Sequence, residues 1–199
     1  MEKYLFVKQL SGLIEKEDFV KRVFSVYLKS IAIFTILAGL VGFVVSWKDV
    51  LKLSTTGLIG GIIFQTLFII AVYSVVHSLL LGAENIKENK EADPIFTHTG
   101  CEILKSFSLA YGLFASIMAI GGGIFIWFAG AGVRNTNSLF RVLNHYYPFT
   151  NLQGEVFIQG LSFMIRGIAY AFLISLGLYI LSEVLTAVVR LHRSENRSR

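Results

Sequence analysis

The sequence lacks most of the features on which disulfide-linked and soluble catalytic domains depend. Cys101 is its single cysteine, so no disulfide forms within the chain and no Cys-x-x-Cys redox site exists. It contains no phosphate-binding loop, no Gly-x-Ser-x-Gly turn, no His-Glu-x-x-His motif and no cluster of Cys and His with zinc spacing. These absences argue against an enzyme and against a structural metal site.

Charge is also scarce, because Asp, Glu, Lys and Arg make up 16% of the 199 residues, whereas 54% are hydrophobic. The apolar residues come in runs of about twenty, a length typical of membrane spans, rather than dispersed with the periodicity of a soluble core. The formal net charge of +5 does not indicate nucleic acid binding, since the basic residues form no patch interleaved with aromatic side chains. We expect an integral membrane protein surrounded by the lipid bilayer.

Four apolar runs predict an all-α fold, an antiparallel bundle of four transmembrane helices that forms a single membrane domain over residues 1–199. Residues 1–28 are amphipathic and predict a cytoplasmic helix, which either lies on the membrane surface or packs on the rest of the protein. The predicted spans cover residues 30–47, 58–81, 106–129 and 160–189. Each is long enough, or nearly so, to cross the hydrocarbon core of a bilayer.

The longest predicted connection covers residues 130–155, on the outer side of the membrane. In it, Asn137 and Ser138 have side chains that could cap a short helix carrying Leu139, Phe140, Val142 and Leu143. The aromatic segment 145–149 follows, and its composition suits the level of the lipid headgroups.

Small residues in two of the runs predict close helix packing. Gly121, Gly122 and Gly123 would each cost about 1 kcal/mol against Ala in a helix in water, but are tolerated in a membrane where neighbours pack on the bare backbone. The last run has a row at intervals of four residues, which consists of Gly167, Ala171, Ser175, Tyr179 and Glu183. We predict that Gly167, Ala171 and Ser175 face another helix.

The distribution of basic residues predicts the orientation. Thirteen Lys and Arg residues lie in the segments that the four spans place on one side, and four lie in the segments on the other side. Because basic residues accumulate on the cytoplasmic side, we expect cytoplasmic N and C termini in a cell membrane, either plasma or inner.

The spans contain few polar side chains, and some of them fall at matching depth. His77 and Glu183 both lie near the predicted cytoplasmic ends of their spans, where a His beside a carboxylate could relay protons or bind a cation. The alternative is a structural interhelical hydrogen bond, with a snorkelling lysine nearby. This candidate intramembrane cluster consists of His77, Glu183, Tyr73, Tyr179 and Lys29.

Arg166 and Gln65 form a second candidate site near the outer headgroups. Arg166 could bind an anion together with Gln65 or with the aromatic loop, or it could anchor its helix to lipid phosphate. No cofactor is expected, because a b-type haem needs two axial histidines at matching depth and His77 is the single histidine inside a predicted span.

Two functions fit these patterns. The first is a non-enzymatic packing or accessory component of a membrane assembly, whose partners are copies of itself or other membrane proteins. The alternative is a small transporter or channel subunit that couples to protons or cations through His77 and Glu183. A polar cavity between the second and fourth spans would favour the alternative, and a close-packed inner third would favour the first.

Overall fold

A computed structural model describes residues 17–88, 95–146 and 154–198, and all regular secondary structure within these ranges is helical. The long helices are α2 (Glu17–Val50), α3 (Thr55–Glu88), α4 (Ile95–Ala129) and α7 (Val156–Ser198), and the short ones are α5 (Val133–Thr136) and α6 (Ser138–Tyr146). Each long helix contains a stretch long and apolar enough to cross a membrane, at Phe19–Val50, Thr55–Glu88, His98–Ala129 and Val156–Val188. The all-α class and the four apolar helices are therefore confirmed.

The helices continue beyond the apolar runs. α2 begins at Glu17, so the part of the predicted N-terminal segment that the structure describes runs without a break into the first apolar run. No glycine or proline interrupts residues 17–38, and a helix has no reason to end at a change of polarity alone. Residues 1–16 lie outside the described part of the chain.

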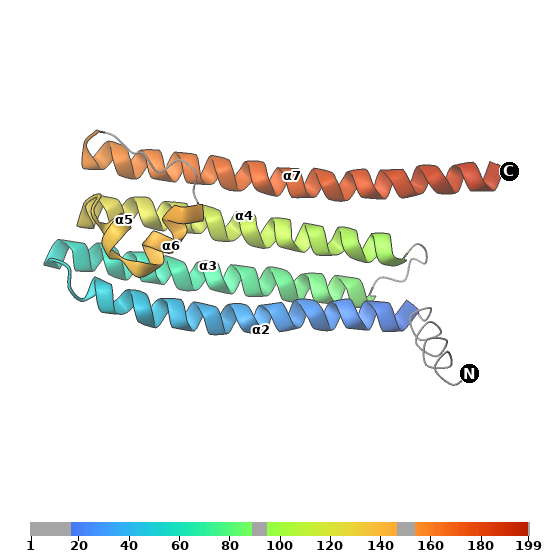
Figure 1. Cartoon of the computed structure of the whole chain (residues 1–199), viewed down its shortest axis with the longest axis horizontal. Helices are drawn as coiled ribbons and strands as arrows, with labels where there is room; N and C mark the ends of the chain where they lie inside the picture. Colours follow the sequence, from blue (N-terminus) through green and yellow to red (C-terminus); the bar gives the residue numbers. More distant parts are fainter. Residues whose placement is uncertain (1–16, 89–94, 147–153, 199) are drawn as a thin grey trace, which may run out of the picture.

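The four long helices form a row (Figure 1), in which α3 packs between α2 and α4, and α4 packs between α3 and α7. Figure 1 shows α5, α6 and the turn between α2 and α3 at the same end of the long helices, here called the α6 end. The last residues of α7 lie at the opposite end of the helices. Half of the apolar window of α4 is buried, against 11% of the windows of α2 and α7. α4 is thus the most buried of the four long helices.

The three consecutive glycines of α4 lie against α3, α6 and α7. Gly121 lies against Leu67 of α3, and Gly122 lies against the rings of Phe140 in α6 and Phe163 in α7. A methyl group on Gly123 would come within 2.6 Å of the backbone oxygen of Gly160 in α7. The prediction that neighbouring groups pack against this bare backbone is confirmed.

The short helix α6 closes the core at the α6 end. Phe140 is fully buried, and its ring lies 5.2 Å from that of Phe163, 5.6 Å from Phe64 and 6.1 Å from Phe125, measured between centroids. These partners belong to α7, α3 and α4, so one side chain joins three long helices. Asn137 Oδ1 accepts a hydrogen bond of 2.9 Å from the Phe140 amide, which confirms the predicted short helix and its capping segment. The side chains of the aromatic segment 145–149 lie outside the described residues.

Candidate functional site

The predicted partners His77 and Glu183 lie on helices that α4 separates. His77 is on an exposed face of α3, where its ring stacks on that of Tyr73, with centroids 6.0 Å apart and an interplanar angle of 12°. Lys29 is exposed on α2, on the other side of α3 from α4. Matching depth follows from chain direction, but it does not determine which helices are neighbours, and here the order of the row keeps the two residues apart.

The partner of Glu183 is instead Lys105 of α4. The distance from Lys105 Nζ to Glu183 Oε1 is 3.0 Å, and the same amine lies 5.5 Å from the centroid of the Tyr179 ring. The side chains of Lys105 and Glu183 are 33% and 52% exposed, so the pair lies at the margin of the helix contact. Of the five residues of the predicted cluster, Glu183 and Tyr179 come together around this lysine, and His77 pairs with Tyr73 elsewhere.

Next to this pair, a line of polar contacts, here called the seam, holds α4 to α7. It consists of Cys101 and Ser108 of α4 and of Ser175, Ser182 and Thr186 of α7. Ser108 and Ser175 exchange hydrogen bonds, and Ser182 Oγ donates to the Cys101 carbonyl oxygen at 3.2 Å. Cys101 Sγ in turn donates to the Ser182 carbonyl oxygen at 3.3 Å and lies 3.2 Å from Thr186 Oγ1. Polar groups inside an apolar interface are stabilising when they bond one another, and here each bonds across the seam.

The sequence contained a signal for this seam. Cys101, Lys105, Ser108 and Gly112 follow one another at intervals of four, three and four residues, which places them on one face of a helix. The predicted third span began at residue 106, so Cys101 and Lys105 were assigned to the preceding connection and Ser108 and Gly112 to the span. Because α4 begins at Ile95, all four lie on the same continuous helix, with Cys101, Lys105 and Ser108 bonded to α7 and Gly112 packed against it.

The second predicted pair, Gln65 and Arg166, is also divided between α3 and α7, with α4 between these helices. Arg166 lies on an exposed part of α7. Gln65 is 2% exposed, and neither its amide nitrogen nor its amide oxygen has a hydrogen-bond partner among the described residues. A buried polar side chain without a partner is uncommon and costly.

Packing between α2 and α3 shows what lies near Gln65. Gly61 of α3 packs against Val50 of α2, and Phe68 of α3 packs against Gly42 of α2. Gln65 and Ser46 lie between these two contacts along their helices. Ser46 is fully buried and is bonded to Asn137, with Asn137 Nδ2 donating to Ser46 Oγ at 3.0 Å. Gln65 therefore lies at the level of a buried polar pair, close to the point where α6 begins.

That point is the α6 junction, formed by Ser46 and Asp49 of α2 with Asn137 and Ser138. Asp49 Oδ2 accepts hydrogen bonds from the backbone amide of Ser138 at 2.9 Å and from its hydroxyl at 2.7 Å. A carboxylate at the start of a helix also interacts favourably with the helix dipole. Lys52 Nζ lies 3.8 Å from the other oxygen of Asp49. Sequence reasoning identified the capping segment but missed its carboxylate, because Asp49 is far away in the chain.

The junction also forms one wall of a pocket of about 310 Å³. The pocket is lined by Asp49, Lys52, Leu53, Thr136 and Asn137. The lining residues provide hydrogen-bonding groups and charges, but they do not include the pair of a nucleophile and a neighbouring base that covalent catalysis needs. Among the described residues, no group of three or more His, Cys, Asp and Glu side chains is placed to hold a metal ion.

No protein-family model, curated protein or solved structure matches this chain. A functional proposal therefore rests on the arrangement of the helices and on the contacts of the seam.

Proposed function

We propose that this protein is a non-enzymatic component of a membrane assembly, which packs against other membrane proteins or against copies of itself. In this proposal its four long helices cross a cell membrane as an antiparallel bundle, with α6 at the outer end and both termini in the cytoplasm. The observation that carries the proposal is the open row of helices. α2 and α7 stand at its two ends, and only 11% of each apolar window is buried.

The way that α4 meets α7 favours packing over transport. Between these helices, Ser108 and Ser175 bond each other, Lys105 pairs with Glu183, and Gly123 meets the backbone of Gly160. Coupled transport needs polar groups that exchange partners with water or with a transported ion. Side chains already bonded across a glycine-lined contact support a structural role. The transporter alternative has less support, because His77 and Glu183 lie on helices that α4 separates.

α7 is the helix on which we place the partner. It packs mainly against α4, and its other sides expose large apolar residues such as Phe172 and Leu173, at 64% and 62%. Gly177 interrupts this surface, and a Cβ atom added there would meet nothing within 4 Å. A small residue in the middle of an exposed span allows the backbone of a partner helix to approach closely.

A photo-cross-linking experiment in intact cells tests this placement. A photoreactive amino acid at Leu173 of α7 is compared with one at Ile69 of α3, an exposed apolar position that is 53% exposed. We expect a protein adduct of defined mass from Leu173 and none from Ile69. An adduct of twice the mass of the chain would identify a second copy. Equal adducts at both positions, or none at either, would contradict the proposal.

A further inference from the structure

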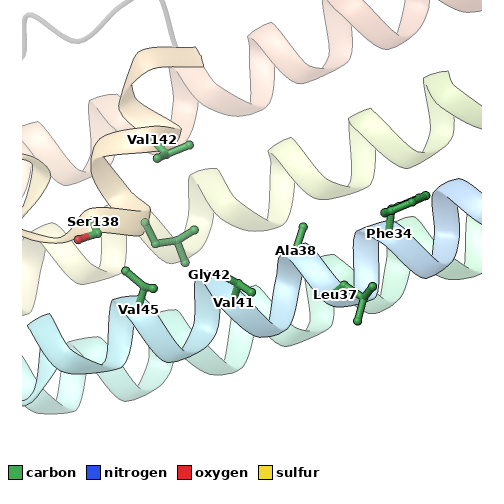
Figure 2. A pocket seen from close by; sticks show the side chains of 9 residues that line it. Phe34, Leu37, Ala38, Val41, Gly42, Val45, Ser138 and Val142 are labelled. Atoms are coloured by element: carbon green, nitrogen blue, oxygen red, sulfur yellow. The ribbon is translucent and has the colours of Figure 1, made fainter.

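An apolar groove runs along α2 beneath α6 (Figure 2). Its volume is about 580 Å³. The α2 side is formed by Phe34, Leu37, Ala38, Val41, Gly42 and Val45, and the α6 side by Ser138, Leu139 and Val142. Ser138 is its single polar residue, and the hydroxyl of that residue already donates to Asp49. The groove therefore offers contact to hydrocarbon and no vacant polar partner.

The length of the groove corresponds to one leaflet of a bilayer. Val45 lies eleven positions after Phe34, which is about 16 Å along an α-helix. This is roughly half of the ~30 Å hydrocarbon core of a membrane. The length of the groove thus matches the part of the bilayer that one acyl chain spans, and the groove ends where the polar α6 junction begins.

The width of the groove suits a hydrocarbon chain better than a helix. A volume of about 580 Å³ spread over about 16 Å gives a mean cross-section of about 36 Å². An α-helix with its side chains is at least ~10 Å across, which requires roughly 80 Å². A hydrocarbon chain, whose atoms make van der Waals contact at about 4 Å, is far narrower and fits within this section.

The polar end of the groove carries the charge that a phosphate needs. Lys52 lines the pocket of about 310 Å³ at the junction, and Arg141 is exposed on α6 close enough for its charge to act on Asp49. Two cations and one carboxylate leave a single net positive charge, which complements the single negative charge of a phosphodiester. Arg and Lys both bind phosphate well, and Arg does so through two parallel hydrogen bonds.

We propose that the groove between α2 and α6 is a binding site for one glycerophospholipid. One acyl chain lies along α2 from Val45 to Phe34, and the phosphate lies at Arg141 and Lys52 above the α6 junction. The lipid covers the face of α2 that none of the described long helices covers, and it lies against Val142 of α6. This inference depends on α2 crossing the membrane, and it is independent of any partner on α7.

Two valines of α2 provide matched variants to test the chain-binding part. Val41 lines the groove and is 64% exposed, whereas Val44 is 56% exposed and does not line it. The full-length protein is reconstituted in vesicles of phosphatidylcholine and phosphatidylglycerol, extracted in mild detergent and examined by native mass spectrometry. We expect one retained phospholipid in the wild type and in Val44→Trp, and at least a tenfold lower retained fraction in Val41→Trp.

The phosphate-binding part is tested with charge variants. The double variant Lys52→Gln and Arg141→Gln should lower the retained fraction by about tenfold, the usual effect of losing hydrogen bonds to a charged group. Lys48→Gln, which removes an exposed cation at the same end of α2 but outside the pocket, should leave it unchanged. A wild type that retains no phospholipid, or Trp variants that retain equal amounts, would overturn the site. Retention that the double variant leaves unchanged would overturn the assigned phosphate position.

Discussion

Ser108 and Ser175 each donate a side-chain hydrogen bond to the backbone oxygen of the other, at 2.7 and 2.9 Å. The exchange brings the backbones of α4 and α7 close together, and Gly112 makes room for it one turn further along α4. A Cβ atom at Gly112 would overlap Ser175 Oγ and lie 3.3 Å from Ser175 Cβ. The close approach of the two helices therefore depends on a glycine and a small hydroxyl that face each other.

This contact predicts coupled effects of substitution. Gly112→Ala should lower the free energy of unfolding in detergent by about 1–3 kcal/mol, the usual cost of overpacking. In a Ser175→Ala background the same change should cost less, because the oxygen that it meets has been removed. A double-mutant cycle measures the difference. Additive effects would mean that the two residues are not in contact.

Two buried amides predict opposite effects on stability. Gln65→Leu removes two buried atoms without a partner among the described residues, so we expect it to raise the free energy of unfolding by about 1–2 kcal/mol. Asn137→Leu removes hydrogen bonds to Ser46 and to the Phe140 amide and should lower it by about 1–3 kcal/mol. Chemical denaturation in detergent compares the two. If Gln65→Leu is as damaging as Asn137→Leu, the Gln65 amide has a polar partner in solution.

The charged pair at the margin of the seam predicts a small coupling with a specific partner. A double-mutant cycle on Lys105→Met and Glu183→Gln should give about 0.2–1 kcal/mol, decreasing as salt is added, because both side chains are partly exposed. The corresponding cycle on His77→Ala and Glu183→Gln should give no coupling. Coupling to His77 of the same size would restore the transport hypothesis.

Orientation is tested by labelling single cysteines in a Cys101→Ser background. Asn135 is exposed in the segment between α4 and α6, and Glu88 is exposed at the opposite end of α3. In intact cells, a membrane-impermeant thiol reagent should label Asn135→Cys and leave Glu88→Cys unlabelled. Asn137 is unsuitable for this purpose, because it is 1% exposed. The reverse pattern would place the termini and α6 on the opposite sides.

Several features of the fold could be predicted from the sequence because they depend on neighbouring residues along one helix. The runs of apolar residues predicted the four long helices. The small row predicted that Gly167, Ala171 and Ser175 face a helix; Gly167 and Ala171 are buried, and Ser175 is bonded to Ser108 of α4. Tyr179 and Glu183, the last two residues of the row, lie only at the margin of this interface, where they meet Lys105. Each step of four residues turns about 40° around a helix, so the contact passes to Ser182 and Thr186 instead.

The order of the helices could not be predicted in this way. His77 and Glu183 could be assigned a common depth from the sequence, but their separation depends on which faces of α3, α4 and α7 fit together. That fit is determined by many contacts, such as those that Gly121 to Gly123 make with α3, α6 and α7. Asp49 was missed for a similar reason. It follows the first apolar run, and nothing in the neighbouring sequence indicates that its carboxylate binds the start of a helix 89 residues later.

The position of Phe140 has a consequence for how the chain is made. Its three ring partners belong to α3, α4 and α7, and the last of these is synthesised after α6 itself. The pocket that receives the ring is therefore incomplete until α7 has packed against α4. During synthesis, Phe140 can meet Phe64 and Phe125 before α7 exists, but it lacks Phe163. The ring contacts of Phe140 are thus completed only when α3, α4 and α7 are all in place, late in the biogenesis of the protein.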